Sequence, residues 1–298
     1  MTNTQIENTA LISTKEKAKA CIELMKPRLS FLVAFSSGFG FILASNGGVN
    51  WLPLLVVSFG GILVSGGSIA INQVIEREYD ALMKRTKNRP LPTNRLTVNE
   101  AILFAVFCLT VGLGMLYFTT NLFTVGLSFL SMLLYSFVYT PLKRVGPIAV
   151  FVGAIPGALP PLIGWVAVTG TITFEALIIF GIQFIWQFPH FWAIAWVADE
   201  DYKKAGFKML PSGGKKDFQT AINIMIYTLF LLPLGLMPMY FGITGINSGV
   251  VVTICGTLFL AQTFSLLRDN SDKNALKIMY GSFLYLPIVQ IAFLLDKI

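Results

Sequence analysis

The chain has 298 residues, of which 55% are hydrophobic and only 12% are charged, with a formal net charge of +7 and a mean hydropathy of +0.71. Soluble domains carry about 25% charged residues, so this composition excludes a soluble globular protein and favours a polytopic membrane protein. The three cysteines, Cys21, Cys108 and Cys255, lack CxxC and CxxCH spacings, which argues against a zinc site, a disulfide framework and covalently attached haem.

The N-terminal segment differs from the rest of the chain. Residues 1–28 are polar and of mixed charge, without the apolar core and small-residue cleavage site of a signal peptide. The first apolar run, which begins at Leu29, is therefore expected to stay in the mature protein. We expect residues 1–28 to form a cytoplasmic segment and residues 29–298 to form a single transmembrane domain.

Nine apolar segments of about the length that crosses a bilayer, roughly 20 residues, follow one another. They are too long and too continuously apolar for the alternating strands of a membrane barrel, so the predicted fold is an all-α bundle of nine transmembrane helices. The predicted spans are 29–46, 50–72, 99–119, 122–140, 147–168, 172–198, 218–241, 247–267 and 276–295.

The positive charges fall on one side of such a bundle. If the nine helices alternate in direction, 21 of the 22 Lys and Arg residues lie on the side that holds the N-terminus, and only Lys297 lies on the other. The positive-inside rule makes the first side cytoplasmic. We therefore expect a multi-pass protein of the cell inner (plasma) membrane with a cytoplasmic N-terminus and no nucleic-acid partner.

A polar stripe follows the second predicted span. Asn72, Glu76 and Asp80 recur at every fourth residue, so on a continued helix they share one face over about 12 Å. Two carboxylates on one face repel each other unless a cation lies between them, and such oxygen ligands suit Mg²⁺, which commonly bridges carboxylate to phosphate. Bases that suit a phosphate follow at once: Arg85, Lys87 and Arg89.

Two further charged clusters are expected at the same rim. The loop after the sixth span carries three acids and then three bases, and a short basic loop follows the fourth span. Solvated charges that only fix the topology are the simpler interpretation of such loops. The charged residues are Asp199, Glu200, Asp201, Lys203, Lys204 and Lys208 in the first loop and Lys143 and Arg144 in the second.

A transporter is a competing interpretation from a different function class. Nine helices and a fifth span that contains 153-GAIPGALPPLIG-164 suit a transporter, because Pro breaks the helical ladder beside cavities. Transporters, however, place polar coupling groups near the membrane midplane, whereas these carboxylates gather at one edge. The same proline-rich span is equally consistent with a kinked helix beside a substrate cavity.

The sequence resembles the UbiA superfamily of intramembrane prenyltransferases over nearly its whole length. The resemblance implies that an Asn-led acidic motif after helix 2 and a second acidic motif after helix 6 bind Mg²⁺ and an isoprenoid diphosphate. It rests on the segments 72-NQVIEREYDALMKRTKNRPLP-92, 135-YSFVYTPLKR-144, 153-GAIPGALPPLIGW-165, 187-QFPHFWAIAW-196 and 201-DYKKAGFKMLP-211.

The resemblance also assigns roles to residues of this chain. Asn72, Glu76 and Asp80 match the first motif, with Glu76 where Asp is common, and Asp201 with Asp199 represents the second, less regular motif. Asn72, Glu76, Asp80 and Asp201 are expected to be catalytic, and these four together with Asp199 are the expected metal ligands. The expected diphosphate-binding residues are Arg85, Lys87, Arg89, Lys143, Arg144 and Lys204.

Within this superfamily the segments are most similar to members that modify haem. The resemblance implies transfer of a farnesyl group from farnesyl diphosphate to a vinyl carbon of haem b, followed by addition of water, to make haem O. An aromatic or quinone-precursor acceptor is the alternative, and a non-catalytic haem-handling protein would leave the basic cluster without a purpose. The implied downstream partners are haem A synthase or terminal oxidase assembly proteins.

Several other residues carry weaker expectations. His190 is the only histidine and lies within a span, where an ionisable residue is a functional candidate; it could ligate haem iron, contact a propionate or simply cap a helix. Trp192 and neighbouring aromatic residues could line a porphyrin or could equally lie in the interfacial belt, which is the expected place of Trp196. Lys26 and Arg28 are expected to anchor the first helix at the interface, with a substrate role as the alternative. The paired glycines of the second span, Gly60-Gly61 and Gly66-Gly67, are expected to permit close helix packing.

Overall fold

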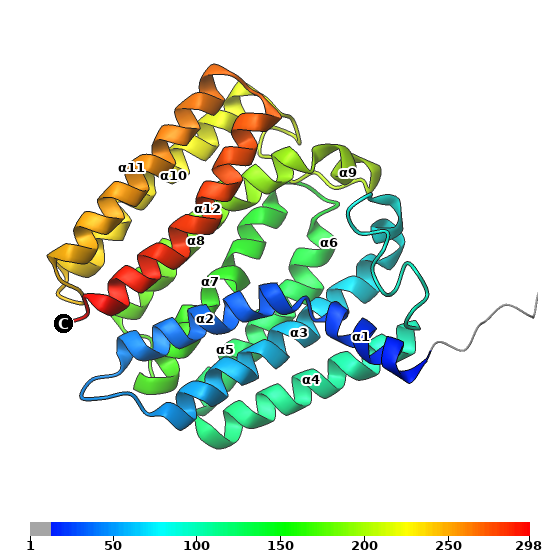
Figure 1. Cartoon of the computed structure of the whole chain (residues 1–298), viewed down its shortest axis with the longest axis horizontal. Helices are drawn as coiled ribbons and strands as arrows, with labels where there is room; N and C mark the ends of the chain where they lie inside the picture. The colour runs from blue at the N-terminus through cyan, green and yellow to red at the C-terminus, as the bar shows by residue number, and fades with distance from the viewer. Residues whose placement is uncertain (1–12) are drawn as a thin grey trace, which may run out of the picture.

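The computed structural model describes residues 13–298, so part of the predicted N-terminal segment, residues 1–12, lies outside the described residues. Over residues 13–298 the chain is helical, and its only β-pairing is an isolated bridge between Thr244 and Lys297. The helices are α1 (Thr14–Leu24), α2 (Pro27–Ala44), α3 (Trp51–Leu82), α4 (Val98–Thr119), α5 (Leu122–Leu133), the π-helical segment η1 (Leu134–Tyr139), α6 (Thr140–Leu142), α7 (Ile148–Thr169), α8 (Phe174–Val197), α9 (Asp199–Lys204), α10 (Phe218–Tyr240), α11 (Ile246–Arg268) and α12 (Asp272–Leu295) (Figure 1).

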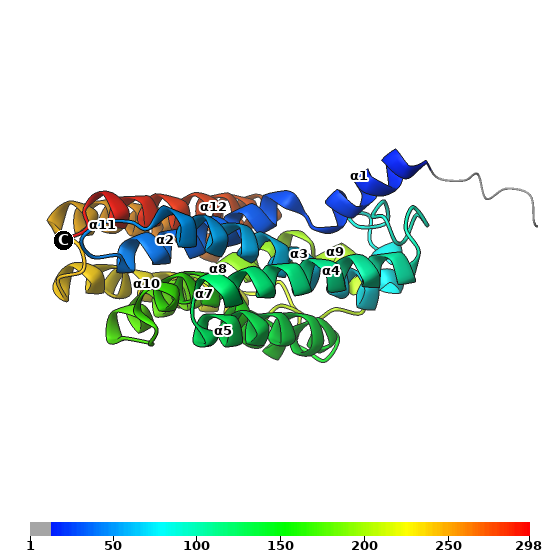
Figure 2. The ribbon, with the colours of Figure 1, turned by 90° about the horizontal axis from the view of Figure 1, so that it is seen from below.

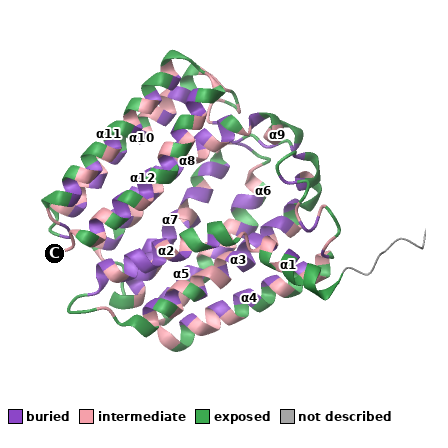
Figure 3. Cartoon of the chain, in the orientation of Figure 1, coloured by how far each residue is buried: buried purple, intermediate pink, exposed green. Residues whose placement is uncertain are grey.

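Nine helical stretches within residues 13–298 are long and apolar enough to cross a membrane, with α5, η1 and α6 counted as one. They agree with the nine predicted spans to within a few residues at most ends, so the predicted all-α bundle is confirmed. Large apolar side chains remain exposed on the outer faces, such as Ile254, Leu258 and Phe264 of α11 (Figure 3). So much exposed apolar surface would be unfavourable in water and suits contact with lipid, so the chain is a multi-pass membrane protein.

The loops that carry charge lie together. In Figure 1 the loop between α3 and α4, the short helix α9 and the N-terminal helix α1 occupy one end of the bundle, and the C-terminus lies at the other. Viewed from the side, α2 and α12 lie on one face of the bundle and α5, α7 and α10 on the opposite face (Figure 2). Segments far apart in the sequence therefore meet at a single end.

Helix α3 extends well beyond its predicted end. It was predicted to span residues 50–72 but continues without interruption to Leu82. At about 1.5 Å per residue its 32 residues span about 48 Å, which exceeds the roughly 30 Å of a hydrocarbon core. Its last turns therefore carry Asn72, Glu76 and Asp80 on one continuous helix, as the four-residue spacing requires.

Glycines allow the tightest helix crossings. A Cβ atom added to Gly164 of α7 would lie 1.8 Å from the Ser37 carbonyl oxygen of α2, and one added to Gly40 would lie 1.9 Å from the Pro161 carbonyl oxygen. A Cβ atom added to Gly60 or Gly67 would lie 3.3 or 2.8 Å from atoms of α4, and one added to Gly66 would lie 2.6 Å from Met25, whereas one added to Gly61 would have only an ordinary contact, 3.8 Å from Ser37. The predicted close packing of the second span is thus confirmed for three of its four paired glycines. The three prolines of α7 lie inside a helix that continues to Thr169.

Helix α1 is tied to the ends of α3 and α4. Its Lys17 pairs with Glu100 of α4 at 2.5 Å, and its Glu23 pairs with Arg95 of the α3–α4 loop at 2.6 Å. The Gln73 side chain donates a hydrogen bond to the Leu24 carbonyl oxygen at 2.7 Å, at the point where α1 ends. The expected polar segment is thus partly a helix that braces the loop carrying Arg85–Arg89.

The prediction that Trp196 lies in the interfacial belt is wrong. Its side chain is fully buried in the core formed mainly by α7, α8, α10 and α12. The reason is that α8 is followed at once by α9 and the segment with Phe207, Met209 and Leu210, which covers the end of the helix where an interfacial tryptophan would otherwise be exposed.

Candidate active site

The polar stripe on α3 is buried. Asn72, Glu76 and Asp80 are at most 4% exposed, although they lie on the last turns of a helix that emerges at the charged end of the bundle. Burial of a carboxylate is costly unless a cation or hydrogen bonds compensate it. The partners of these three side chains therefore define the site.

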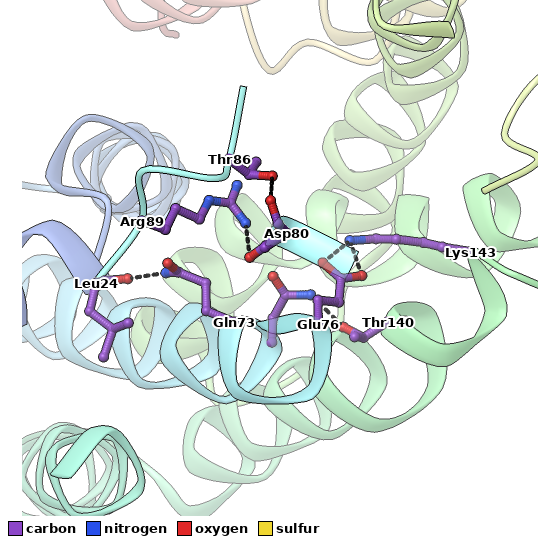
Figure 4. Close-up of polar contacts among 9 residues, drawn as sticks. Leu24, Gln73, Glu76, Asp80, Thr86, Arg89, Thr140 and Lys143 are labelled. Carbon is purple, nitrogen blue, oxygen red and sulfur yellow. Dashed lines mark hydrogen bonds and ion pairs between the residues drawn. The ribbon is translucent and has the colours of Figure 1, made fainter. Parts of the chain in front are cut away.

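Asp80 is held by the loop that follows α3. Its Oδ2 atom accepts a hydrogen bond from the Arg89 guanidinium at 2.6 Å, and its backbone carbonyl accepts one from the Thr86 hydroxyl at 2.8 Å (Figure 4). Arg89 itself is mostly buried. The loop therefore folds back over the end of its own helix and brings a cation onto the stripe.

Glu76 pairs with a lysine from another part of the chain. The Lys143 ammonium lies 2.8 Å from Oε1 and 3.1 Å from Oε2, so it spans the carboxylate (Figure 4). Burial disfavours the charged form of this lysine, but the Glu76 carboxylate, together with the nearby Tyr135 and Tyr202 side chains, outweighs that effect and raises the pKa of Lys143 above its usual value. The ammonium also lies 4.7 Å from the centroid of the Tyr139 ring.

Asn72 is oriented by Thr140. The Thr140 hydroxyl donates its proton to the Tyr135 carbonyl oxygen at 2.8 Å, so it can only accept from the Asn72 amide nitrogen, which lies 2.9 Å away. The amide oxygen of Asn72 is thereby the atom left for a cation. Thr140 directly follows the π-helical segment η1, and π-helical turns are often found at functional sites.

The donor set around the stripe fits a magnesium ion. Asp80 Oδ1 is buried and has no hydrogen-bond partner among residues 13–298, and it lies on the same helix face as the Asn72 oxygen and the Glu76 carboxylate. These are the hard oxygen ligands that Mg²⁺ prefers. Within residues 13–298 no three His, Cys, Asp or Glu side chains converge on one point, so further coordination positions would fall to water and diphosphate oxygens.

The second acidic motif lies beside the first rather than within it. Asp201 accepts hydrogen bonds from the backbone N–H groups of Lys84 and Arg85 at 3.1 and 3.0 Å, directly after α3. Burial opposes its ionisation, but these N–H groups and the Lys204 ammonium hold the pKa of Asp201 below its usual value. Asp199 is buried and pairs with Lys203 at 2.8 Å. The two loops are thus joined through Asp201.

The remaining predicted bases lie on the loops and on α9 at the charged end of the bundle. Arg85 lies 5.9 Å from the centroid of the Tyr202 ring, and Arg144 lies 4.7 Å from that of Tyr79, so both cations rest on aromatic rings beside the acidic residues. Lys204 lies 3.6 Å from Asp201, and the side chain of Lys87 is exposed. These side chains are accessible to a charged ligand that approaches from the loop end.

Lys26, which the sequence predicted to be an interface anchor, lies within electrostatic reach of the site. It precedes α2 in a left-handed backbone conformation, with φ 47°, which few residues other than glycine adopt. Burial, reinforced by the nearby cations of Arg89, Lys143 and Arg85, lowers the pKa of Lys26 to about 7. The sequence shows Lys26 only as a base at the start of a span, and nothing local to it indicates that its ammonium comes within reach of the site.

A row of neighbouring aromatic rings connects the Lys143 ammonium, beside the stripe on α3, with His190 of α8. The Tyr139 ring, which contacts the Lys143 ammonium, lies 6.2 Å from the Phe191 ring, and Phe191 lies 5.6 Å from the His190 ring. His190 stacks on Trp186 at 4.3 Å between centroids. The predicted histidine therefore lies on the same side of the core as the charged cluster.

Trp192 faces a different direction from His190. Its ring packs against Phe188 and against Tyr227 of α10, with centroids 5.4 and 5.1 Å apart, and its indole nitrogen is buried without a partner. His190 instead contacts Phe283 of α12. The structure does not bring these two predicted haem-binding residues together.

Curated relatives resemble the chain along nearly its full length. A protein of Cytophaga hutchinsonii named Protoheme IX farnesyltransferase is 54% identical over 280 residues, which cover 94% of this chain and 98% of the relative. A protein of Christiangramia forsetii with the same name is 42% identical and covers 100% of this chain and 98% of its own. Identities of this size over whole chains indicate a shared family.

Solved structures share the fold. The structure of a digeranylgeranylglyceryl phosphate synthase is similar with a TM-score of 0.78 at 23% identity, covering 94% of this chain and 98% of the other. A UbiA homologue from Archaeoglobus fulgidus bound to GPP and Mg²⁺ has a TM-score of 0.64 at 17% identity, covering 92% and 99%. The sequence itself matches the UbiA prenyltransferase family over residues 32–286, and the chain therefore belongs to that family of intramembrane prenyltransferases.

Proposed function

We propose that the chain transfers the farnesyl group of farnesyl diphosphate to a vinyl carbon of haem b, with addition of water, to make haem O. The observation that carries this proposal is a buried oxygen stripe, Asn72, Glu76 and Asp80, that is surrounded by cations at one end of an apolar bundle. Such a site suits a diphosphate headgroup with a hydrophobic tail. The full-length relatives named Protoheme IX farnesyltransferase support the farnesyl donor and the haem acceptor.

The cations prepare the site for the departing diphosphate. Lys143, Arg89 and Arg85 lie beside the stripe, and Lys26 adds a further positive charge when it is protonated. When bound, Mg²⁺ supplies charge that offsets the negative charge on the leaving oxygens. The donors are fixed before the reaction, so they stabilise charge as it develops without reorganising.

The bond changes in the proposed reaction balance. The bond between C1 of the farnesyl group and the diphosphate oxygen breaks, and both electrons leave with the diphosphate. The π electrons of the haem vinyl group form the new carbon–carbon bond to C1. A water molecule adds to the resulting cation and loses a proton, which leaves a hydroxyl group beside the porphyrin. The apolar bundle holds the isoprenoid tail and keeps water away from the first cation.

The haem is expected to lie against His190. The row Tyr139, Phe191 and His190 connects this residue to the Lys143 ammonium through neighbouring rings, so an acceptor that contacts His190 lies close to the donor headgroup. Aromatic rings along this row suit a flat porphyrin and can stabilise cationic carbon. We assign Trp192 a supporting place in the same core, through its contact with Phe188.

We further propose that the charged end of the bundle faces the cytoplasm across the inner (plasma) membrane. The distribution of Lys and Arg supports this orientation. In a variant without native cysteines, Lys215→Cys is expected to react only with a membrane-impermeant thiol reagent applied from the cytoplasmic side. Asn46→Cys is expected to react only with the same reagent applied from the opposite side. Haem O is more hydrophobic than haem b, so we expect its consumers, haem A synthase or terminal oxidase assembly proteins, in the same membrane.

Mass analysis of porphyrins tests the proposed reaction. Purified protein in lipid vesicles is supplied with haem b, farnesyl diphosphate and Mg²⁺, in parallel with an aromatic acid as competing acceptor. We expect a haem that has gained one farnesyl group and one hydroxyl group, and we expect about 10³-fold slower formation of this product by the Asp80→Asn variant. Farnesylation of the aromatic acid with unchanged haem would support the alternative acceptor and refute the proposal.

A further inference from the structure

We propose that Ser282 on α12 fixes the tautomer of His190, so that the Nε2 lone pair of this histidine is presented to the haem iron as an axial ligand. The inference rests on the proposed function only in taking haem as the substrate. It makes Ser282 a positioning residue, because Ser282 acts through His190 and does not contact the reacting atoms.

Two contacts bring Ser282 and α8 together. His190 Nδ1 lies 2.9 Å from the Ser282 hydroxyl oxygen, and the Trp186 indole nitrogen donates to the Ser282 carbonyl oxygen at 3.0 Å. Ser282 is fully buried, and Trp186 is also buried and stacks on the imidazole with an angle of 21° between the planes. The imidazole is therefore held both in its plane and along one edge.

The number of protons decides the tautomer. The Ser282 hydroxyl has one proton, and its oxygen lies 2.6 Å from the Met279 carbonyl oxygen, which can only accept. If the proton pointed to His190 instead, two acceptor oxygens would face each other at 2.6 Å. The hydroxyl therefore donates to Met279 and accepts from His190, so the imidazole proton resides on Nδ1.

The opposite ring nitrogen is then a lone-pair donor. Among the described residues, the only hydrogen-bond contact of the imidazole runs through Nδ1, which leaves Nε2 without a protein partner. An unprotonated imidazole nitrogen is a ligand for iron, whereas a haem propionate would require a hydrogen-bond donor or a cation. The geometry thus favours the iron over the propionate as the partner of His190.

This arrangement has the form of other metal-binding histidines. A ligating histidine generally donates its second N–H to a fixed acceptor, which orients the ring and increases its basicity, and loss of that acceptor weakens metal binding about 10–100-fold. An iron bond to Nε2 would set the plane of the porphyrin at the end of the row Tyr139, Phe191 and His190. Ser282 would thereby position the vinyl edge relative to the diphosphate.

Nitrogen NMR of the protein without substrate tests the tautomer directly. His190 is the only histidine, so ¹⁵N-histidine labelling of the protein in lipid nanodiscs gives one imidazole to observe. We expect a proton on Nδ1 and a lone pair on Nε2 in the wild type. In Ser282→Ala we expect a shift toward the Nε2–H tautomer, which Ser282→Thr should reverse. A wild-type ring protonated on Nε2 overturns the inference.

Haem binding provides the second measurement. We expect ferric haem b to show the absorption spectrum of a histidine-ligated haem with the wild type, with an affinity about 10-fold lower for Ser282→Ala. Ser128→Ala is the matched control, because Ser128 is another buried serine that donates to a helix carbonyl, on α5 and at 2.9 Å. Its spectrum and affinity should match those of the wild type.

The outcomes separate this inference from the proposed function. If His190→Ala keeps the wild-type haem spectrum while haem O is still made, the iron ligation is refuted and the proposed function stands. If Ser282→Ala binds haem as tightly as the wild type, or if Ser128→Ala weakens binding equally, the positioning role of Ser282 is refuted. If no haem O is made by the wild type, the proposed function itself fails, whatever the tautomer.

Discussion

Asp80→Asn removes one negative charge from the buried face of α3 while it keeps the shape of the side chain. Asp80 acts through both oxygens, because Oδ2 binds Arg89 at 2.6 Å and Oδ1 is the unpartnered atom offered to the metal. Removal of a single preorganised electrostatic contact typically costs about 10²–10³ in rate. Since both contacts are weakened here, we expect a loss near the upper value, about 10³-fold in kcat/KM, or about 4 kcal/mol.

The fold is expected to survive this substitution. The amide oxygen of asparagine can still accept a hydrogen bond from Arg89. The charge-assisted hydrogen bond becomes one with a neutral acceptor, which lowers the free energy of unfolding by about 1–2 kcal/mol. The assay measures haem O formation and, on the same samples, the fraction that remains monodisperse after heating in detergent. A variant that is inactive because it is unfolded would fail the second measurement.

Glu78→Gln is the matched control for Asp80→Asn. Glu78 lies on the same helix, between Glu76 and Asp80, but its side chain is 75% exposed and pairs only with Arg77. Removal of its charge is therefore expected to leave kcat/KM within about 5-fold, since exposed pairs contribute at most about 1 kcal/mol. The assignment of the buried stripe would be refuted if Glu78→Gln lost as much activity as Asp80→Asn, or if Asp80→Asn kept a tenth of the wild-type rate.

Three other perturbations follow from the described contacts. Gly164→Ala places a Cβ atom 1.8 Å from the Ser37 carbonyl oxygen and should lower the free energy of unfolding by about 1–3 kcal/mol, measured by melting in detergent. Gly126→Ala, which has open space around it, should not destabilise the protein. Equal melting temperatures for the two variants would contradict the close crossing of α2 and α7. Lys26 has a pKa of about 7 and is therefore protonated below that pH. Binding of a non-hydrolysable farnesyl diphosphate analogue should weaken as the pH rises from about 6 to about 8, and Lys26→Met should flatten this pH dependence. An unchanged pH dependence in Lys26→Met would contradict the placement of Lys26. Chelation of divalent ions should abolish binding of the same analogue and added Mg²⁺ should restore it, whereas full binding with EDTA contradicts the metal assignment.

The sequence predicted the spans well because bilayer thickness fixes the length of an apolar helix. It also predicted that Asn72, Glu76 and Asp80 share one helix face, since residues four apart do so wherever the helix continues, and α3 does continue to Leu82; the burial of that face was not predicted. Close packing was predicted correctly for Gly60, Gly66 and Gly67, because a small residue on a helix surface permits close approach, but not for Gly61.

The parts that sequence reasoning missed depend on contacts between distant segments. Lys26, which lies at the left-handed turn between α1 and α2, comes within electrostatic reach of Arg89, Lys143 and Asp80, and Ser282 meets His190 across 92 residues of sequence. Trp196 was placed wrongly because the segment that covers it lies beyond its own helix. Periodicity describes one helix at a time and carries no information on which helices become neighbours.

The pairing of His190 with Ser282 has a consequence for biogenesis. The ribosome delivers the N-terminal helices first, so Asn72, Asp80 and Lys143 enter the bilayer long before α12 is made. A nascent chain therefore passes through a stage in which the residues of the prenyl-diphosphate subsite are already present, while His190 stacks on Trp186 of its own helix but lacks the Ser282 hydroxyl. On the proposed iron ligation, His190 is oriented for haem only after α12 inserts, when the donor side is already in place.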